Sequence, residues 1–312
     1  MVGVTVGIDL GGILASVVAL WYGSRFLVDG AVQMARRFGL SELTIGLTIV
    51  AVGTSTPELV VTGDAALAGL GDIAVGNIVG SNIYNLAVVL GVVALFRQVP
   101  VDRAVVRRDG LVMLAATLVV SVLVLDLRLT RLDGGLLVAG LAGYLLWLVR
   151  SGSTSTPAVQ PSASPVWRAT AAIVGGLVLV IAGGHLLVVS ASDIARLFGV
   201  PAWAIGATVV AAGTSTPELA VSLVALRQGR VGVSLGNVIG SNVFNLLGAL
   251  GVAALLRPLT VAPVAVDETL WLLALTSGVL LLLWTGRTLS RPEGGLLVLS
   301  EAVRWASRFL MY

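Results

Sequence analysis

Two glutamates lie within apolar stretches of the chain, and both belong to the same duplicated motif. The sequence GTSTPEL occurs at residues 53–59 and again at 213–219, where it contains Glu58 and Glu218. A charged side chain at the centre of a membrane helix costs roughly 2.5–3.5 kcal/mol on insertion scales, so an acid kept at such a position is a functional hypothesis by default. The motif therefore predicts a pair of buried carboxylates that bind cations.

The proline of each motif is expected to interrupt the helix that carries the glutamate. Pro57 and Pro217 have no backbone N–H, so carbonyl groups in the preceding turn lose their usual donors. The C-terminal end of the interrupted half-helix also has partial negative charge. Carbonyls, hydroxyls and a carboxylate are hard oxygen ligands, which suit Ca²⁺ or Na⁺ rather than soft metals. The carbonyls that we expect to be freed are those of residues 51–54 and 211–214.

A second motif, G-N-x-x-G-S-N-x-x-N, is also duplicated, and it begins at Gly76 and Gly236. Its two glycines are four residues apart, a spacing that lets helix backbones approach closely. Its serine and last asparagine are also four apart, so their side chains share one helix face. Close packing should bring that face against the broken helix of the same repeat. The polar residues expected on this face are Ser81, Asn85, Ser241 and Asn245.

The composition places the chain in a lipid bilayer. Of its 312 residues, 57% are hydrophobic and 11% are charged, whereas about a quarter of the residues in soluble domains are charged. All 19 basic residues are arginines that fall singly or in short clusters between apolar runs, which argues against a nucleic-acid surface. The chain has no Cys, so a disulfide framework, a thiolate metal site and a cysteine nucleophile are excluded. We expect no cofactor and no obligate protein partner.

Apolar runs long enough to span a bilayer predict ten transmembrane helices. The segment SGSTSTPAVQPSASP at 151–165 is rich in Ser, Thr and Pro and reads as a linker between two halves of five helices. The ten segments lie at roughly 5–35, 42–69, 74–96, 110–127, 133–149, 167–196, 202–227, 233–256, 265–286 and 293–311.

The two halves are copies of one another at a constant offset of 160 residues. The first repeat covers 1–150, with its motifs in 42–96, and the second covers 166–312, with its motifs in 202–256. Because each half has an odd number of helices, the second copy must enter the membrane from the opposite side. The sequence thus predicts an all-α polytopic membrane protein made of two inverted five-helix repeats. Transporters of this architecture bind their substrate near the midplane, where the repeats meet.

The arginines also predict an orientation. With the N-terminus outside, twelve arginines fall in cytoplasmic loops and four in external loops. The positive-inside rule therefore puts both termini on the extracytoplasmic side of the cell (inner or plasma) membrane and the linker in the cytoplasm. The N-terminal segment has no positive charge before its apolar run, so we expect a retained transmembrane helix rather than a cleaved signal peptide.

The paired G-T-S-x-P-E and G-N-x-x-G-S-N-x-x-N segments resemble the alpha repeats of the sodium/calcium exchanger family, within the cation/calcium antiporter superfamily. The short linker, without a large regulatory domain, fits a prokaryotic type. The resemblance implies that Glu58 and Glu218 bind Ca²⁺ with the carbonyls of Thr54 and Thr214. It also implies further ligands for Na⁺ and the centre of the site: Ser55, Ser81, Ser215, Ser241, the carbonyls of Ala51 and Ala211, and Asn85 and Asn245.

One departure from the family pattern bears on the ions. Some relatives have Asp at the position of Asn245, whereas this chain has Asn in both repeats, which argues against K⁺ co-transport. Two acids can balance one Ca²⁺ or two Na⁺. Proton-coupled members of the superfamily typically have a G-N-x-x-E pattern in place of G-T-S-x-P-E, so its absence here favours Na⁺ as the driving ion.

We therefore expect a secondary antiporter that exchanges Na⁺ for Ca²⁺ by alternating access, and no enzymatic activity. An H⁺-coupled Ca²⁺ antiporter that uses the same glutamates is the alternative. A cation channel is a further one, although the chain has no repeated selectivity filter to support it. A membrane hydrolase would need a base or metal triad, and the chain's one histidine, His185, is distant from the motifs in sequence.

Overall fold

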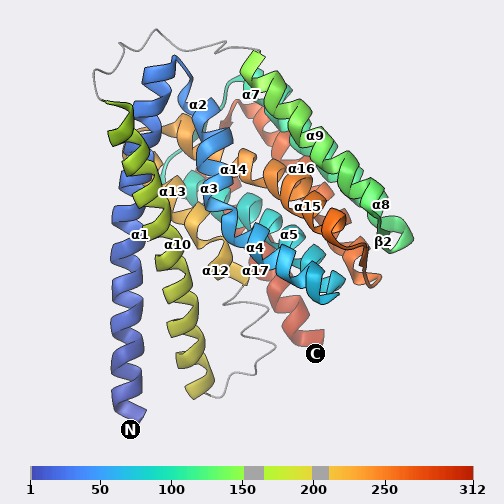
Figure 1. Ribbon diagram of the computed structural model, residues 1–312, viewed down its shortest axis with the longest axis horizontal. Helices are drawn as coiled ribbons and strands as arrows, with labels where there is room; N and C mark the ends of the chain where they lie inside the picture. The colour runs from blue at the N-terminus through green and yellow to red at the C-terminus, as the bar shows by residue number, and fades with distance from the viewer. Residues whose placement is uncertain (1, 151–164, 199–210, 312) are drawn as a thin grey trace. The chain divides into compact units, whose positions relative to one another are not determined.

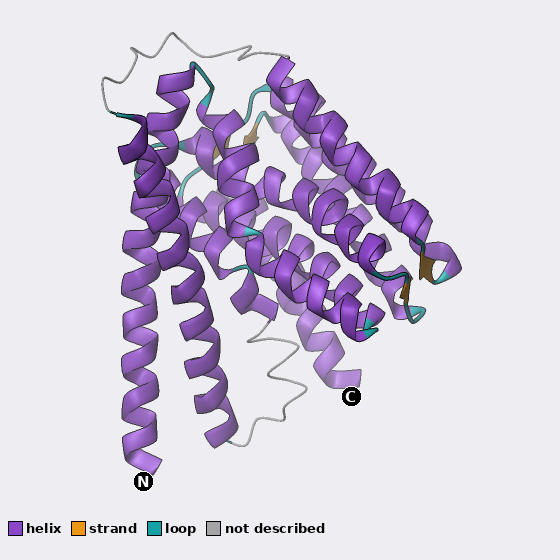
Figure 2. Ribbon diagram, in the orientation of Figure 1, coloured by secondary structure: helices purple, strands orange, loops and turns teal. Residues whose placement is uncertain are grey.

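A computed structural model describes residues 2–150, 165–198 and 211–311, and these are almost entirely helical (Figure 2). The predicted linker lies outside the described residues apart from Pro165. The first half contains α1 (Val2–Phe38), α2 (Glu42–Ile45), η1 (Gly46–Val50), α3 (Ala51–Thr54), α4 (Thr56–Ala68), α5 (Gly71–Tyr84), η2 (Asn85–Val89), α6 (Leu90–Phe96), β1 (Val99–Pro100), α7 (Arg103–Val105), η3 (Val106–Gly110), α8 (Leu111–Leu123), η4 (Val124–Asp126), β2 (Arg128–Leu129) and α9 (Arg131–Arg150). The second half contains α10 (Val166–Leu197), α12 (Ala211–Thr214), α13 (Thr216–Arg227), α14 (Val231–Val243), η6 (Phe244–Ala249), α15 (Leu250–Leu256), β3 (Leu259–Thr260), α16 (Val264–Gly286), β4 (Thr288–Leu289) and α17 (Arg291–Met311).

The described helices follow the predicted membrane segments. Seven are long and apolar enough to cross a membrane, and a bent pair would make an eighth: Val6–Phe38, Gly71–Phe96, Arg103–Asp126, Arg131–Leu148, Val166–Leu197, Val231–Leu256 and Val264–Gly286, with Glu42–Thr54 joined to Thr56–Ala68 as the pair. The predicted span at 202–227 begins outside the described residues. The last predicted span corresponds to α17, which is helical but contains five charged residues and is not among these candidates.

Two compact units make up the chain, and their boundaries do not follow the halves of the sequence. Unit 1 comprises Met1–Pro57 and Ser153–Asn237, and unit 2 comprises Glu58–Gly152 and Val238–Tyr312. Each unit therefore contains parts of both repeats.

In unit 1, the long helices α1 and α10 run side by side (Figure 1). The hydrophobic core of the unit forms where α1 and α10 meet α2, α13 and α14. Leu27 on α1 packs there with Ile45, Val221 and Val233, and all four side chains are fully buried. Apolar residues from both repeats thus fix the positions of α2, α13 and α14 within this unit.

In unit 2, helices of one repeat pack on helices of the other. α17 lies against α6, and α15 lies against α9. At the first contact a Cβ added to Gly91 would lie 2.9 Å from the carbonyl oxygen of Gly294, and at the second one added to Gly134 would lie 2.7 Å from that of Gly251. The glycines therefore let these helix backbones meet at equivalent points of the two repeats.

Two short antiparallel ribbons also join the repeats within unit 2. β1 pairs with β4 through Val99 and Leu289, and β2 pairs with β3 through Leu129 and Leu259. Each ribbon joins the connection between the third and fourth helices of one repeat to the connection between the fourth and fifth helices of the other.

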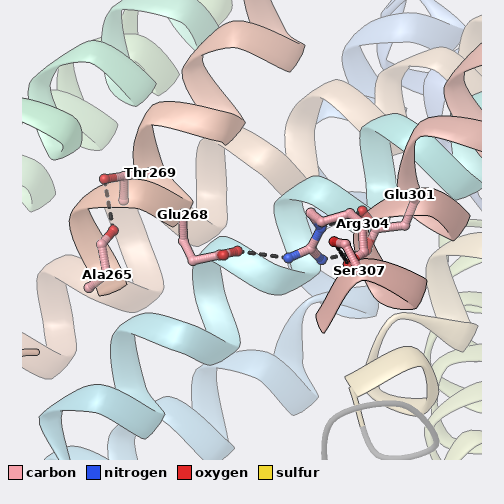
Figure 3. Close-up of polar contacts among 6 residues, drawn as sticks. All are labelled: Ala265, Glu268, Thr269, Glu301, Arg304 and Ser307. Atoms are coloured by element: carbon pink, nitrogen blue, oxygen red, sulfur yellow. Dashed lines mark hydrogen bonds and ion pairs between the residues drawn. The ribbon is translucent and has the colours of Figure 1, made fainter. Parts of the chain in front are cut away.

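A partly buried ion network ties α16 to α17 in unit 2 (Figure 3). The guanidinium of Arg304 donates to Glu268 Oε2 at 2.7 Å and binds both carboxylate oxygens of Glu301. The Glu301 side chain is only 3% exposed. In the first repeat, Tyr144 lies 160 residues before Arg304 and donates at 2.9 Å to buried Asp109, which is one residue beyond the counterpart of Glu268. Both repeats thus join their fourth and fifth helices by a polar contact, but with different residues.

Replacing Arg304 with glutamine should destabilise the protein strongly, because it leaves Glu301 buried without its cation. Breaking a buried pair in this way costs about 3–5 kcal/mol. The melting temperature in detergent measures this loss. Arg196→Gln is the matched control, because its pair with Asp193 is exposed, with side-chain accessibilities of 63% and 41%, and exposed pairs contribute about 0–1 kcal/mol. Equal melting temperatures for the two variants would contradict a stabilising role for the network.

Candidate functional site

The helix that contains the first GTSTPEL motif is broken, as the sequence predicts. α3 ends at Thr54 and α4 begins at Thr56, with a bend of 46° between the two helical segments. The break falls at Ser55, two residues before the proline. The N–H of Ser55 donates to the carbonyl of Ala51 at 3.0 Å, so the prediction that the break frees this carbonyl from its backbone hydrogen bond is wrong. Pro57 occupies the first turn of the next helix, where its missing N–H costs little.

The second motif is broken in the same way. α12 ends at Thr214, α13 begins at Thr216, and Ser215 between them has nearly the same backbone angles as Ser55 (φ −92° and ψ 7°, against −85° and 9°). Ser215 is fully buried. Ala211 is the first residue of α12. Both copies therefore have a hydroxyl-bearing turn directly before the helix that contains the glutamate.

In unit 1, the break in the first repeat meets the glutamate of the second. The hydroxyl of Ser55 donates to Glu218 Oε1 at 2.9 Å, and both residues are fully buried. Thr54 lies beside them, also fully buried, and its hydroxyl is 3.3 Å from the carbonyl of Ala51. Ligands that the sequence predicts from different repeats are thus brought together in this unit.

In unit 2, the glutamate of the first repeat has a serine partner from its own repeat. Ser81 Oγ on α5 lies 3.4 Å from Glu58 Oε1, at the long end of hydrogen-bond distances. Glu58 is fully buried and Ser81 is 3% exposed. The predicted packing of the serine face against the broken helix is therefore confirmed for the first repeat. Ser241 is also fully buried, on α14.

The last asparagine of each G-N-x-x-G-S-N-x-x-N motif lies in a π-helical turn. Asn85 begins η2, and Asn245 is the second residue of η6. Such turns are rare and frequently occur at functional sites. Asn245 donates to Asn82 Oδ1 at 3.1 Å. Within the described parts of the chain, Asn245 Oδ1 and both polar atoms of the Asn85 side chain have no hydrogen-bond partner.

Uncompensated polar atoms at full burial cost free energy unless they bind something. Amide oxygens are acceptable ligands for Na⁺ and Ca²⁺. Asn85 and Asn245 therefore meet the chemical requirement for ligands of a hard cation, and both lie in unit 2.

Close helix packing at the second motif is found in one of its two copies, but its partner is the other repeat and not, as predicted, the broken helix of the same repeat. A Cβ added to Gly236 on α14 would lie 2.5 Å from the carbonyl oxygen of Leu43 and 3.0 Å from the Cα of Gly46. α14 and η1 are therefore in backbone contact in unit 1. A Cβ added to Gly76 or Gly80 would meet no atom within 4 Å in the part of the chain that the structure describes.

Four polar residues beside the glutamates were not among the predicted ligands. Asn77 donates to the main-chain carbonyl of Glu58 at 3.3 Å and to Thr62 at 2.9 Å. In the second repeat, Asn237 donates to the carbonyl of Glu218 at 3.3 Å and to Ser222 at 3.1 Å. The signal was present in the sequence. Both copies of the second motif have an asparagine at its second position, and both glutamates are followed four residues later by a hydroxyl residue.

Comparison with known proteins identifies the family of this fold and site. The family model described as sodium/calcium exchanger protein matches residues 8–150 and 168–300. The sodium/calcium exchanger MaX1 of Methanosarcina acetivorans is 32% identical over 330 residues, covering 92% of this chain and 94% of that protein. The inner membrane protein YrbG of Escherichia coli is 32% identical over 301 residues, covering 91% of each.

The solved structures agree. The sodium–calcium exchanger NCX_Mj, soaked with Na⁺ and Sr²⁺, superposes with a TM-score of 0.86 at 33% identity, over 97% of this chain and 99% of that one. The described fold is therefore that of NCX_Mj, an all-helical multi-span membrane protein built from two repeats.

Proposed function

Because the chain belongs to the sodium/calcium exchanger family, we propose that it exchanges Na⁺ for Ca²⁺ across the membrane by alternating access. It is a membrane transporter, not an enzyme. The observation that carries the proposal is the duplicated pair of fully buried carboxylates, each beside a serine hydroxyl: Ser55 with Glu218, and Ser81 with Glu58.

Glu58 and Glu218 supply the charge in this proposal. Two carboxylates balance one Ca²⁺ or two Na⁺, so the ions compete for the same ligands and exchange follows from their competition. The remaining ligands are neutral oxygens, a mixture that suits hard cations. The proposed set comprises the carbonyls of Thr54, Thr214, Ala51 and Ala211, the hydroxyls of Ser55, Ser81, Ser215 and Ser241, and the amides of Asn85 and Asn245.

The helices proposed to move are α1 and α10. α10 contacts the break in both repeats: Leu177 packs against Gly53, Val188 packs against Gly213, and Gly184 lies beside Pro217. These contacts, all within unit 1, support the proposal because a shift of α10 would change the packing at both motifs. Both helices also exceed the length needed to span a bilayer, which allows them to tilt.

Transport by the purified protein in proteoliposomes tests the function directly. Vesicles loaded with Na⁺ and diluted into Na⁺-free buffer should accumulate ⁴⁵Ca²⁺, and vesicles with equal Na⁺ on both sides should not. A proton conductor should not reduce the uptake. Ca²⁺ uptake driven by a pH gradient without Na⁺ would instead favour the H⁺-coupled antiporter, and unitary currents in a planar bilayer would favour a channel.

We also propose that both termini are extracytoplasmic, in the inner or plasma membrane, with the linker in the cytoplasm. The absence of native Cys allows a labelling test. Ser155→Cys in the linker should react with a membrane-impermeant maleimide only after the cells are permeabilised. Leu132→Cys, at a side chain that is 86% exposed beside a predicted external loop, should react in intact cells. The reverse labelling pattern would mean that both termini are cytoplasmic and the linker is extracytoplasmic.

A further inference from the structure

Asn237 joins three segments of unit 1 through a single side chain. Its Oδ1 accepts a hydrogen bond from the Thr54 hydroxyl at 3.0 Å, at the end of α3. Its Nδ2 donates to the main-chain carbonyl of Glu218 at 3.3 Å and to Ser222 Oγ at 3.1 Å, both on α13. The residue is fully buried on α14. Thr54 comes from the first repeat and Glu218 from the second, so this amide links proposed ligand segments of both repeats.

An asparagine side chain is the right group for this position. Its planar amide has a carbonyl oxygen that accepts hydrogen bonds and an NH₂ group that can donate two. Here the acceptor receives the threonine hydroxyl, and the donor faces a carbonyl and a hydroxyl. An aspartate would lose both donor protons, and an apolar residue would leave all three partners with an unmade bond.

The backbone next to Asn237 brings it to this place. Gly236, the preceding residue, lies in backbone contact with Leu43 and Gly46 of the segment that leads into α3. That contact fixes the distance between α14 and the broken helix, and Asn237 spans the remaining gap to Thr54.

The first repeat has the same two donor bonds beside its own glutamate. Asn77 on α5 donates to the carbonyl of Glu58 at 3.3 Å, the same distance as in the second repeat, and to Thr62 Oγ1 at 2.9 Å. Thr62 follows Glu58 by four residues, as Ser222 follows Glu218. The repetition in both units argues that the bonds serve the glutamates rather than one local packing need.

We propose that Asn237 and Asn77 are positioning residues for ion binding, and that Asn237 fixes Thr54 relative to Glu218. The inference rests on the proposed function, since it assumes that these two residues bind the transported cation. Residues that hold metal ligands in place typically change affinity about 10–100-fold when they are replaced. The inferred effect is therefore on cation affinity and not only on folding.

The test measures Ca²⁺ binding by the full chain without relying on transport. Equilibrium binding of ⁴⁵Ca²⁺ is titrated for purified wild type and Asn237→Leu, and the Ca²⁺ concentration at the midpoint of saturation is recorded; the melting temperatures without Ca²⁺ are measured in parallel. Asn237→Leu should move this midpoint about tenfold or more to higher Ca²⁺. A residue with a purely structural role would lower the melting temperature without moving the midpoint. A parallel titration with Na⁺ shows whether the two ions are affected unequally.

A double-mutant cycle with Thr54→Val tests the specific link. Thr54→Val removes the hydroxyl but keeps the carbonyl that is proposed to bind Ca²⁺. If Asn237 acts through this hydroxyl, the double variant should bind Ca²⁺ no more weakly than Asn237→Leu alone. Ser192→Ala is the control, because Ser192 is a buried hydroxyl on α10 outside the proposed site, and it should leave the midpoint unchanged.

The outcomes separate the inference from the function. A midpoint for Asn237→Leu within twofold of the wild type would overturn the positioning role while leaving the exchanger proposal intact. If the weakening of Ca²⁺ binding in the double variant equals the product of the fold-changes of the two single variants, the proposed link between Asn237 and Thr54 is wrong. If the wild type binds neither Ca²⁺ nor Na⁺, and no Na⁺-driven uptake occurs, the proposed function fails and the inference with it.

Discussion

Replacing Glu218 or Glu58 with glutamine should reduce Na⁺-driven Ca²⁺ uptake by about 100-fold or more. Removing a residue that only supports a metal ligand costs about 10–100-fold in affinity, and removing a charged ligand should cost at least the upper end of that range. Each substitution halves the charge available for Ca²⁺. The measurement is the initial rate of ⁴⁵Ca²⁺ uptake into Na⁺-loaded proteoliposomes.

The glutamine variants should remain folded. Glutamine has nearly the shape of glutamate and can still accept the hydroxyl of Ser55 or Ser81. It also removes a buried charge, so the melting temperature without cations should stay the same or rise. Asp64→Asn is the matched control, since it changes an exposed acid to an amide on the same helix as Glu58, and its uptake should stay within twofold of wild type. Uptake by either glutamine variant within about threefold of wild type would remove that glutamate from the proposed ligand set.

Gly236→Val should prevent the broken helix and α14 from reaching their positions. Even a Cβ at this position would lie 2.5 Å from the carbonyl oxygen of Leu43 and 2.9 Å from the N of Leu47, both backbone atoms. Overpacking against side chains costs about 1–3 kcal/mol, and backbone gives way less easily. We expect a large drop in melting temperature or yield, and uptake reduced at least about tenfold because Asn237 moves away from Thr54.

The equivalent glycine of the first repeat provides the control. Gly76→Val places the same side chain at the corresponding point of the other copy, where a Cβ would contact no described atom within 4 Å. Its melting temperature should stay near that of the wild type. A loss at Gly76→Val as large as that at Gly236→Val would mean that helix propensity, not the contact with Leu43, causes the effect.

Much of the fold and part of the site could be predicted because they depend on local sequence. Apolar length predicts the spans, and the seven candidate spans and the bent pair overlap eight of the ten predicted segments. The breaks before Pro57 and Pro217 follow from the missing N–H of proline. Burial of Glu58 and Glu218 follows from their apolar surroundings, and the structure confirms it for both.

Features that depend on distant pairings could not be predicted in the same way. Glu268 and Arg304 are 36 residues apart, and no period of the sequence brings them together. Asn237 bonds to Thr54 across 183 residues, so the partner becomes visible only when α14 is placed against α3. The π-helical turns at Asn85 and Asn245 were also not predicted, since such turns are rare and the spacing of apolar residues does not mark them.

The two short ribbons of unit 2 constrain the order of biosynthesis. β1 begins at Val99, but its partner β4 ends at Leu289 and is therefore made much later. The strands β1 and β2 of the first repeat therefore stay unpaired while the ribosome makes most of the second repeat. Because neither ribbon can form within one repeat, the final arrangement of unit 2 is reached only after β4 has been made, and a chain truncated before β4 would leave β1 without its partner.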